Sequence, residues 1–113
     1  MHELGLMDAV IKTVGRIIKE ENLTSVRKIV LEVGELSGVV THFITDCYEA
    51  VVADTQYQDT ELVLEIVPGI ARCNHCQIEF RIDIKDLCCP VCYGKNLTPI
   101  KGKDLTIKEI EAY

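Results

Sequence analysis

Two Cys-x-x-Cys pairs constrain this chain more than any other feature. Cys73 and Cys76 form the first pair, and Cys89 and Cys92 form the second, with twelve residues between the pairs. This spacing is typical of a hairpin site in which four thiolates hold one zinc ion. Turn amides can donate hydrogen bonds to the sulfurs, and four thiolates at roughly 2.3 Å leave no open position for a substrate. We therefore expect a structural ion and not a catalytic one.

Other interpretations of the cysteines stay open at this point. Paired disulfides would need an oxidising compartment, and a single Cys-x-x-Cys is typical of thiol exchange. Tetrahedral sulfur also suits iron, which would colour the protein. Cys88 could compete with Cys89 as a ligand of the ion. Cys89 is favoured because it forms a Cys-x-x-Cys pair with Cys92, whereas Cys88 would form Cys-x-x-x-Cys. His75, inside the first pair, is expected to face solvent and not to bind the ion.

Length and charge narrow the class of partner. The chain has 113 residues, which suits one small core with a zinc subdomain. Residues 1–70 carry 5 Lys/Arg and 12 Asp/Glu, whereas residues 71–102 carry 5 and 3. A ribbon that grips nucleic acid presents a clustered basic face with stacking aromatic residues. Because this surplus is slight and Trp is absent, we expect no nucleic-acid partner.

We expect neither a secretory signal nor a membrane span. Glu3 and Asp8 interrupt the first apolar residues, and no basic region precedes them. No apolar run approaches the ~20 residues that a membrane helix needs. The predicted location is the cytoplasm, where thiols stay reduced and free to bind metals.

Apolar periodicity predicts an α+β fold. In residues 3–21 apolar side chains recur every three or four positions, which predicts a helix with Asn22 as its stop. A second helix is predicted through about Thr55, with Thr41 as its cap. Its predicted apolar side consists of Phe43, Ile44, Cys47, Val51 and Val52. Strands are predicted over residues 26–33, 61–67 and 104–111.

The last predicted strand defines the domain organisation. A terminal strand this short cannot stand alone, so it should pair with the sheet of residues 26–67. The fold is then a small domain of two helices packed on a three-stranded sheet, with an inserted β-rich zinc ribbon. This divides the chain into a discontinuous α/β domain, residues 1–70 plus 103–113, and a zinc-ribbon domain, residues 71–102. A hairpin arm between the cysteine pairs is predicted from Ile78, Phe80, Ile82 and Ile84.

Met1-His2-Glu3 offers a second place for a metal. The terminal amine, the His2 amide and the His2 imidazole can chelate one ion with three nitrogens in a plane. The Glu3 amide or carboxylate could supply a fourth donor. Planar nitrogen coordination favours Ni(II) or Cu(II), and protonation should release the metal as pH falls. The alternative is that His2 is an ordinary exposed terminal residue.

Taken together, these motifs resemble the HypA/HybF family of nickel metallochaperones. The resemblance covers essentially the whole chain, and its combination of motifs is more specific than any one of them. The motifs are Met1-His2-Glu3 before an amphipathic helix, Gly34-Glu35-Leu36-Ser37 after the first strand, the two cysteine pairs, and Gly102-Lys103-Asp104-Leu105 at the last strand.

The resemblance implies a nickel-delivery protein and not an enzyme. It implies that the protein takes part in the maturation of nickel–iron hydrogenase and, in some organisms, of urease. Nickel would bind at His2 with the Met1 amine and nearby amides, with Glu3 tuning or completing the site. The structural zinc would lie on Cys73, Cys76, Cys89 and Cys92. The implied partners are a HypB-type GTPase, the hydrogenase large-subunit precursor and, as an option, a second copy of the chain.

The main alternative is a zinc-ribbon adaptor that binds a protein partner without transferring nickel. A catalytic role is not expected, because the histidines at positions 2, 42 and 75 form no recognisable set of nucleophile, base and acid. As a hypothesis, the acidic face of the first helix and the Gly34–Gly38 turn frame the docking surface for the GTPase.

Overall fold

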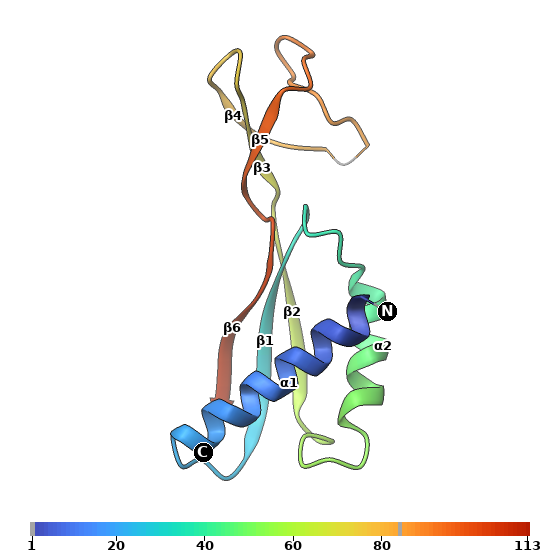
Figure 1. Ribbon diagram of the computed structural model, residues 1–113, viewed down its shortest axis with the longest axis vertical. Coiled ribbons are helices and arrows are strands. Elements are labelled where there is room, and N and C mark those ends of the chain that lie inside the picture. Colours follow the sequence, from blue (N-terminus) through green and yellow to red (C-terminus); the bar gives the residue numbers. More distant parts are fainter. Residues whose placement is uncertain (1, 84) are drawn as a thin grey trace. The chain divides into compact units, whose positions relative to one another are not determined.

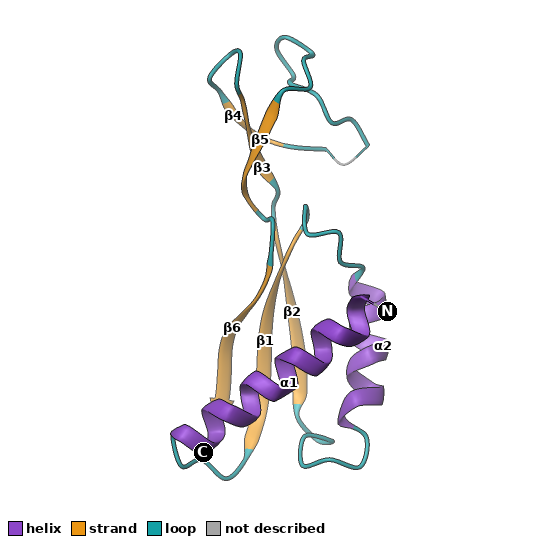
Figure 2. Ribbon diagram, viewed as in Figure 1, coloured by secondary structure: helices purple, strands orange, loops and turns teal. Residues whose placement is uncertain are grey.

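The computed structural model describes residues 2–83 and 85–113 and has an α+β architecture, as predicted (Figure 1). The elements are α1 (His2–Glu20), β1 (Val26–Gly34), α2 (Thr41–Val52), β2 (Glu61–Val67), β3 (Ile70–Cys73), β4 (Glu79–Arg81), β5 (Leu97–Lys101) and β6 (Leu105–Ala112). The helices lie before β2, and the second half of the chain consists of strands and turns (Figure 2).

The chain forms two compact units. The first contains the chain up to Leu31, Val40–Glu65 and Thr106–Tyr113, and the second contains Glu32–Val39 and Ile66–Leu105. The division into domains made from the sequence, at residues 70/71 and 102/103, stays a prediction. No described helix combines the length and the apolar character needed to cross a membrane.

The first sheet has the strand order β2-β1-β6, so the terminal strand pairs with β1 as expected. The predicted inward face of β1, Ile29, Leu31 and Val33, is buried. Val30 points to the opposite face and is also buried. Its neighbours on that face, Lys28 and Glu32, are half-buried. The alternation alone did not reveal this second buried face, because it depends on β1 being the middle strand.

Helix α1 contributes its predicted apolar stripe to the core and packs against α2. The buried side chains of the stripe are Met7, Val10, Val14 and Ile18. Asn22 ends the helix, as predicted, in the left-handed region at φ 56°. The amide of Leu23 donates to the carbonyl of Ile18, and that of Asn22 donates to Lys19. This pattern is a Schellman cap, in which the left-handed residue lets free carbonyls find donors.

The predicted cap of α2 is wrong. Thr41 is the first helical residue, and Val40 occupies the cap position without a side-chain hydrogen bond. The helix also ends at Val52, three residues before the predicted end at Thr55. The Thr55 hydroxyl donates to the carbonyl of Val52 at 2.6 Å, and Asp54 has a φ of 59°. A polar side chain that bonds the last helical carbonyl therefore replaces the next helical turn.

The buried face of α2 differs from the predicted one at three positions. Ile44, Cys47 and Val52 are buried as expected, whereas Val51 is half-buried and Phe43 is 49% exposed. Tyr48 takes a place in the core, and its hydroxyl donates to the carbonyl of Thr60 at 2.7 Å. A tyrosine can be buried here because its polar end has this partner, a contact that periodicity does not show.

The second unit contains a sheet of order β4-β3-β5. Strand β3 pairs antiparallel with both neighbours, so that Ala71 lies opposite Phe80 on one side and Pro99 on the other. Pro99 is tolerated because β5 is an edge strand. The predicted hairpin arm is shorter than expected among the described residues: β4 covers only Glu79–Arg81, and Ile84 of the predicted arm lies outside the described residues. One hydrogen bond beyond the strand, from the amide of Ile82 to the carbonyl of Gly69 at 2.9 Å, continues the pairing.

Candidate metal centre

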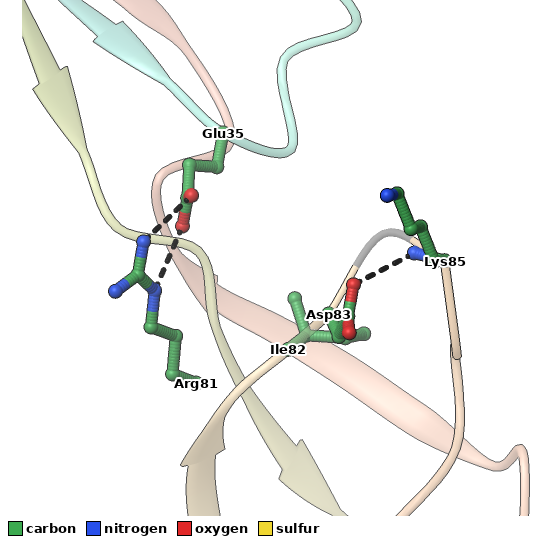
Figure 3. A pocket seen from close by; sticks show the side chains of 5 residues that line it. All are labelled: Glu35, Arg81, Ile82, Asp83 and Lys85. Carbon is green, nitrogen blue, oxygen red and sulfur yellow. Dashed lines mark hydrogen bonds and ion pairs between the residues drawn. The ribbon is translucent and has the colours of Figure 1, made fainter.

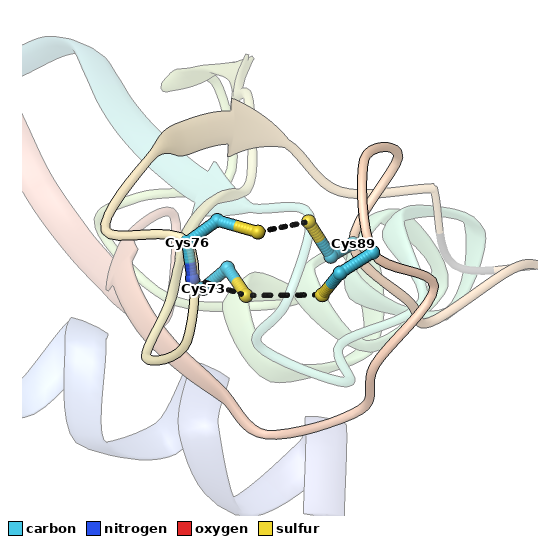
Figure 4. Close-up of side chains that lie close together, drawn as sticks. Cys73, Cys76 and Cys89 are labelled. Atoms are coloured by element: carbon cyan, nitrogen blue, oxygen red, sulfur yellow. Dashed lines mark hydrogen bonds between the residues drawn. The ribbon is translucent and has the colours of Figure 1, made fainter.

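The structure brings together the four cysteines that the spacing singled out. The sulfurs of Cys73, Cys76, Cys89 and Cys92 all lie within 4.8 Å of one another. Figure 4 shows the side chains of the labelled residues Cys73, Cys76 and Cys89 close together. Cys73 Sγ is 3.7 Å from Cys92 Sγ, and Cys89 Sγ is 3.9 Å from Cys76 Sγ. Cys73 and Cys89 are buried, whereas Cys92 is exposed.

These sulfur–sulfur distances fit a tetrahedral ion. Four sulfurs at roughly 2.3 Å from a central zinc would be about 3.8 Å from one another by tetrahedral geometry. The two short separations, 3.7 and 3.9 Å, lie on either side of that value. The donor set therefore suits a closed four-thiolate site.

Both cysteine pairs adopt the same backbone turn, which we call the first knuckle (residues 73–78) and the second knuckle (residues 89–94). In each, the residue after the second cysteine is left-handed, Gln77 at φ 62° and Tyr93 at φ 58°. The amide of that residue donates to the carbonyl of the first cysteine at 2.9 Å in both knuckles. The repeated turn explains why two cysteines three positions apart can face one point.

Amides of the knuckles point at the sulfurs. Cys76 N donates to Cys73 Sγ, Val91 N to Cys89 Sγ and Gly94 N to Cys92 Sγ, each at 3.4 Å. Backbone donors at Cys92 and then Val91 lower the pKa of the Cys89 thiol to about 7. Hydrogen bonding to Cys92, followed by burial, raises the pKa of Cys76 to about 12. The backbone donors therefore favour the thiolate form of Cys89.

Two residues left open by the sequence lie outside the cluster. The Cys88 thiol bonds the Asp86 carboxylate at 3.1 Å, and this bond is the main cause of a raised Cys88 pKa. His75 is exposed, as expected. Within the part of the chain that the structure describes, the cluster consists of cysteines alone.

The predicted nickel site is only partly described. Met1 and the side chain of His2 lie outside the described residues, while the backbone of His2 is the first residue of α1. Glu3 is half-buried, and its carboxylate accepts a hydrogen bond from the amide of Val40 at 3.5 Å. Glu3 thus lies beside the start of α2.

A hollow of about 450 Å³ lies in the second unit, lined by Glu35, Arg81, Ile82, Asp83 and Lys85 (Figure 3). The Arg81 guanidinium is the main cause of a lowered pKa at Glu35, and the Gly69 amide adds to it. The sequence analysis did not identify Arg81 as the partner of Glu35. The two residues are 46 positions apart, so no local pattern connects them.

Comparison with known proteins places the chain in a family. Residues 1–112 match the family model described as "Hydrogenase/urease nickel incorporation, metallochaperone". The chain is 34% identical over 111 residues to hydrogenase maturation factor HypA of Geotalea uraniireducens, covering 98% of each. It is 37% identical over 112 residues to HypA of Streptomyces avermitilis, covering 97% of this chain and 86% of the relative.

The fold is also found among solved structures. The solution structure of the nickel metallochaperone HypA from Helicobacter pylori superposes with a TM-score of 0.71, covering 97% of this chain and 96% of that one. Its sequence is 18% identical, so this likeness concerns the fold. This chain therefore belongs to the HypA family of hydrogenase maturation factors, which are nickel metallochaperones and not enzymes.

Proposed function

We propose that this chain binds Ni(II) at its N-terminus and delivers it during the maturation of nickel–iron hydrogenase. The observation that carries the proposal is the family match, which spans residues 1–112 and so includes the first three residues. Delivery needs a site from which the ion can leave by ligand exchange. A chain terminus meets that need better than a closed four-thiolate cage.

The nickel ligands are the Met1 amine, the amide and imidazole of His2, and a donor from Glu3. The position of His2 at the start of α1 supports this set. The first amides of a helix have no carbonyl partner within the helix, so the His2 nitrogen can coordinate without breaking a helical hydrogen bond. Protonation of the amine and imidazole releases the ion at low pH.

A structural Zn(II) belongs on Cys73, Cys76, Cys89 and Cys92. The fit of the sulfur–sulfur distances to a thiolate tetrahedron supports this assignment. When bound, zinc supplies folding free energy on the order of 10 kcal/mol, enough to hold a small ribbon that has few buried apolar side chains.

The partners in this function are a HypB-type GTPase and the precursor of the hydrogenase large subunit, with a homodimer as an option. Urease is a second recipient, which the family description supports. The cytoplasm is the proposed location, because the thiols must remain reduced.

The test is a calorimetric Ni(II) titration of the untagged, zinc-loaded chain. His2→Ala and a form extended by one residue at the N-terminus remove two of the proposed nitrogen donors. His42→Ala is the matched control, because its side chain is 74% exposed on α2. We expect about one nickel per chain for the wild type and the control, and loss of binding in the other two forms.

The other outcomes separate the alternatives. Wild-type binding by His2→Ala and the extended form would place nickel elsewhere in the chain. Absence of nickel binding in the wild type would favour an adaptor that binds a protein partner without metal transfer.

A further inference from the structure

We propose that Asn74 is a positioning residue that makes the first knuckle the rigid half of the four-cysteine centre, so that the metal is lost by way of Cys92. The inference rests on the proposed zinc ion. It concerns how firmly each knuckle is held. The two knuckles have the same backbone conformation and the same kind of ligand, but they differ in their contacts to the rest of the chain.

Asn74 joins the first knuckle to β5. Its side-chain amide donates to Asn96 Oδ1 and to Thr98 Oγ1, both at 3.0 Å. Its Oδ1 lies 3.2 Å from the Thr98 hydroxyl, and its backbone amide donates to the carbonyl of Asn96 at 3.0 Å. A single residue between two ligands therefore contacts Thr98 of β5 and Asn96, which directly precedes that strand.

The first knuckle is held in further ways. Cys73 is the last residue of β3 and pairs with Leu97 of β5. The Gln77 side chain donates to the carbonyl of Asn74 at 2.9 Å, which fixes the peptide that follows Asn74. Both ends of the knuckle and its centre are thus bonded to the sheet or to each other, which leaves the sulfur positions little freedom.

The second knuckle has only local support. In the described chain, residues 89–94 form hydrogen bonds only with one another. The contacts between the sulfurs of the cluster are the exception. The side chains around its second ligand are in solvent, with Val91 64% and Tyr93 75% exposed. Cys92 itself is exposed. The second knuckle therefore depends on the bound ion to hold its position, and its exposed ligand Cys92 releases the ion first.

The test uses the full zinc-loaded chain with limiting chelator and N-ethylmaleimide. Peptide mass spectrometry follows the labelling of each cysteine, with Cys88 as the internal reference outside the cluster. We expect Cys92 to be labelled before Cys73 and Cys76 in the wild type. In Asn74→Ala, labelling of Cys76 should rise by at least about fivefold, because one net hydrogen bond accounts for about that change and the variant loses side-chain contacts to both Asn96 and Thr98.

Matched variants isolate the contact to β5. Thr98→Val should raise labelling of Cys76 in the same direction, and its combination with Asn74→Ala should add little, because both changes remove one interaction. His75→Ala is the control in the same knuckle, since its exposed side chain makes no hydrogen bond within the described residues. It should label like the wild type.

Four results would overturn the inference. One is simultaneous labelling of all four cysteines in the wild type. Another is an unchanged order and rate at Cys76 in Asn74→Ala. A third is an equal acceleration at every cysteine with a lower melting temperature, which would indicate general destabilisation. A wild-type chain that holds no zinc would also overturn it, while the nickel titration would still test metal delivery separately.

Discussion

The guanidinium of Arg81 holds the carboxylate of Glu35 with two hydrogen bonds, Nη2 to Oε2 at 2.9 Å and Nε to Oε1 at 3.3 Å. Glu35 Oε1 also accepts a hydrogen bond from the amide of Gly69 at 2.8 Å. One carboxylate thus connects the segment after β1, the turn before β3 and the end of β4. A Glu35→Lys variant would break these contacts, so it is not a clean test of the hypothesis that the Gly34–Gly38 turn docks the GTPase.

Replacing Glu35 by Gln should lower the thermal stability of the protein in a pH-dependent way. The folded-state pKa of Glu35 lies below its ordinary value of 4.5. The ion pair with Arg81 therefore stabilises the fold at neutral pH, and that contribution is lost as pH falls through the lowered pKa. Melting curves of the wild type and Glu35→Gln should differ at pH 7 and converge towards pH 3.

Glu61→Gln provides the control for this comparison. Glu61 is exposed on β2 and makes no ion pair within the described residues. Its removal should leave the melting temperature nearly unchanged at pH 7. A gap between the wild type and Glu35→Gln that stayed constant over the whole pH range would contradict the ion-pair explanation.

Gly34→Ala should destabilise the protein by about 3 kcal/mol, since overpacking of a tight backbone contact is costly. A Cβ at this position would collide with the carbonyl of Gly102. That same carbonyl accepts a hydrogen bond from Leu36 N at 2.8 Å, so it is not free to move away. Urea denaturation measures the effect.

Gly38→Ala is the matched comparison. Gly38 has open space around its Cα, but its φ is 77°. Only the left-handed backbone resists a side chain there, at a cost of about 1–2 kcal/mol. A Gly34→Ala variant as stable as the wild type would contradict the explanation by crowding against Gly102.

Replacing Cys88 or Cys89, which are adjacent in the sequence, should have contrasting effects on the zinc content of the protein. Cys89→Ser removes a sulfur of the cluster and should abolish stable zinc binding, with loss of the β4-β3-β5 sheet signals by NMR. Cys88→Ser removes only the thiol that bonds Asp86 and should keep one zinc per chain. Elemental analysis of the two purified variants decides the matter. Retention of zinc by Cys89→Ser with loss in Cys88→Ser would exchange their roles.

The cap of α1 can be tested at Asn22, which lies in the left-handed region. Asn22→Ala should cost about 1 kcal/mol, because a β-carbon without a polar group disfavours that conformation. Asn22→Gly should match or slightly exceed the wild type in urea denaturation. An alanine variant as stable as the glycine variant would mean that the cap contributes nothing.

Local sequence determined much of the architecture. The apolar stripe from Met7 to Ile18 predicted α1, Asn22 predicted its end, and the terminal strand found its place beside β1. The two Cys-x-x-Cys pairs predicted four sulfurs at one point, because each pair is contained in one turn. These features depend on residues within a few positions of one another, so periodicity and spacing reveal them.

Tertiary structure decided the features that join distant segments. The burial of Tyr48 in place of Phe43 depends on a carbonyl at Thr60. The contacts of Glu35 with Arg81 and of Asn74 with Thr98 join residues 46 and 24 positions apart. Such pairs form only after the strands have paired in register. No propensity or motif in the chain specifies them, because the physical cause is the register and not the residue type.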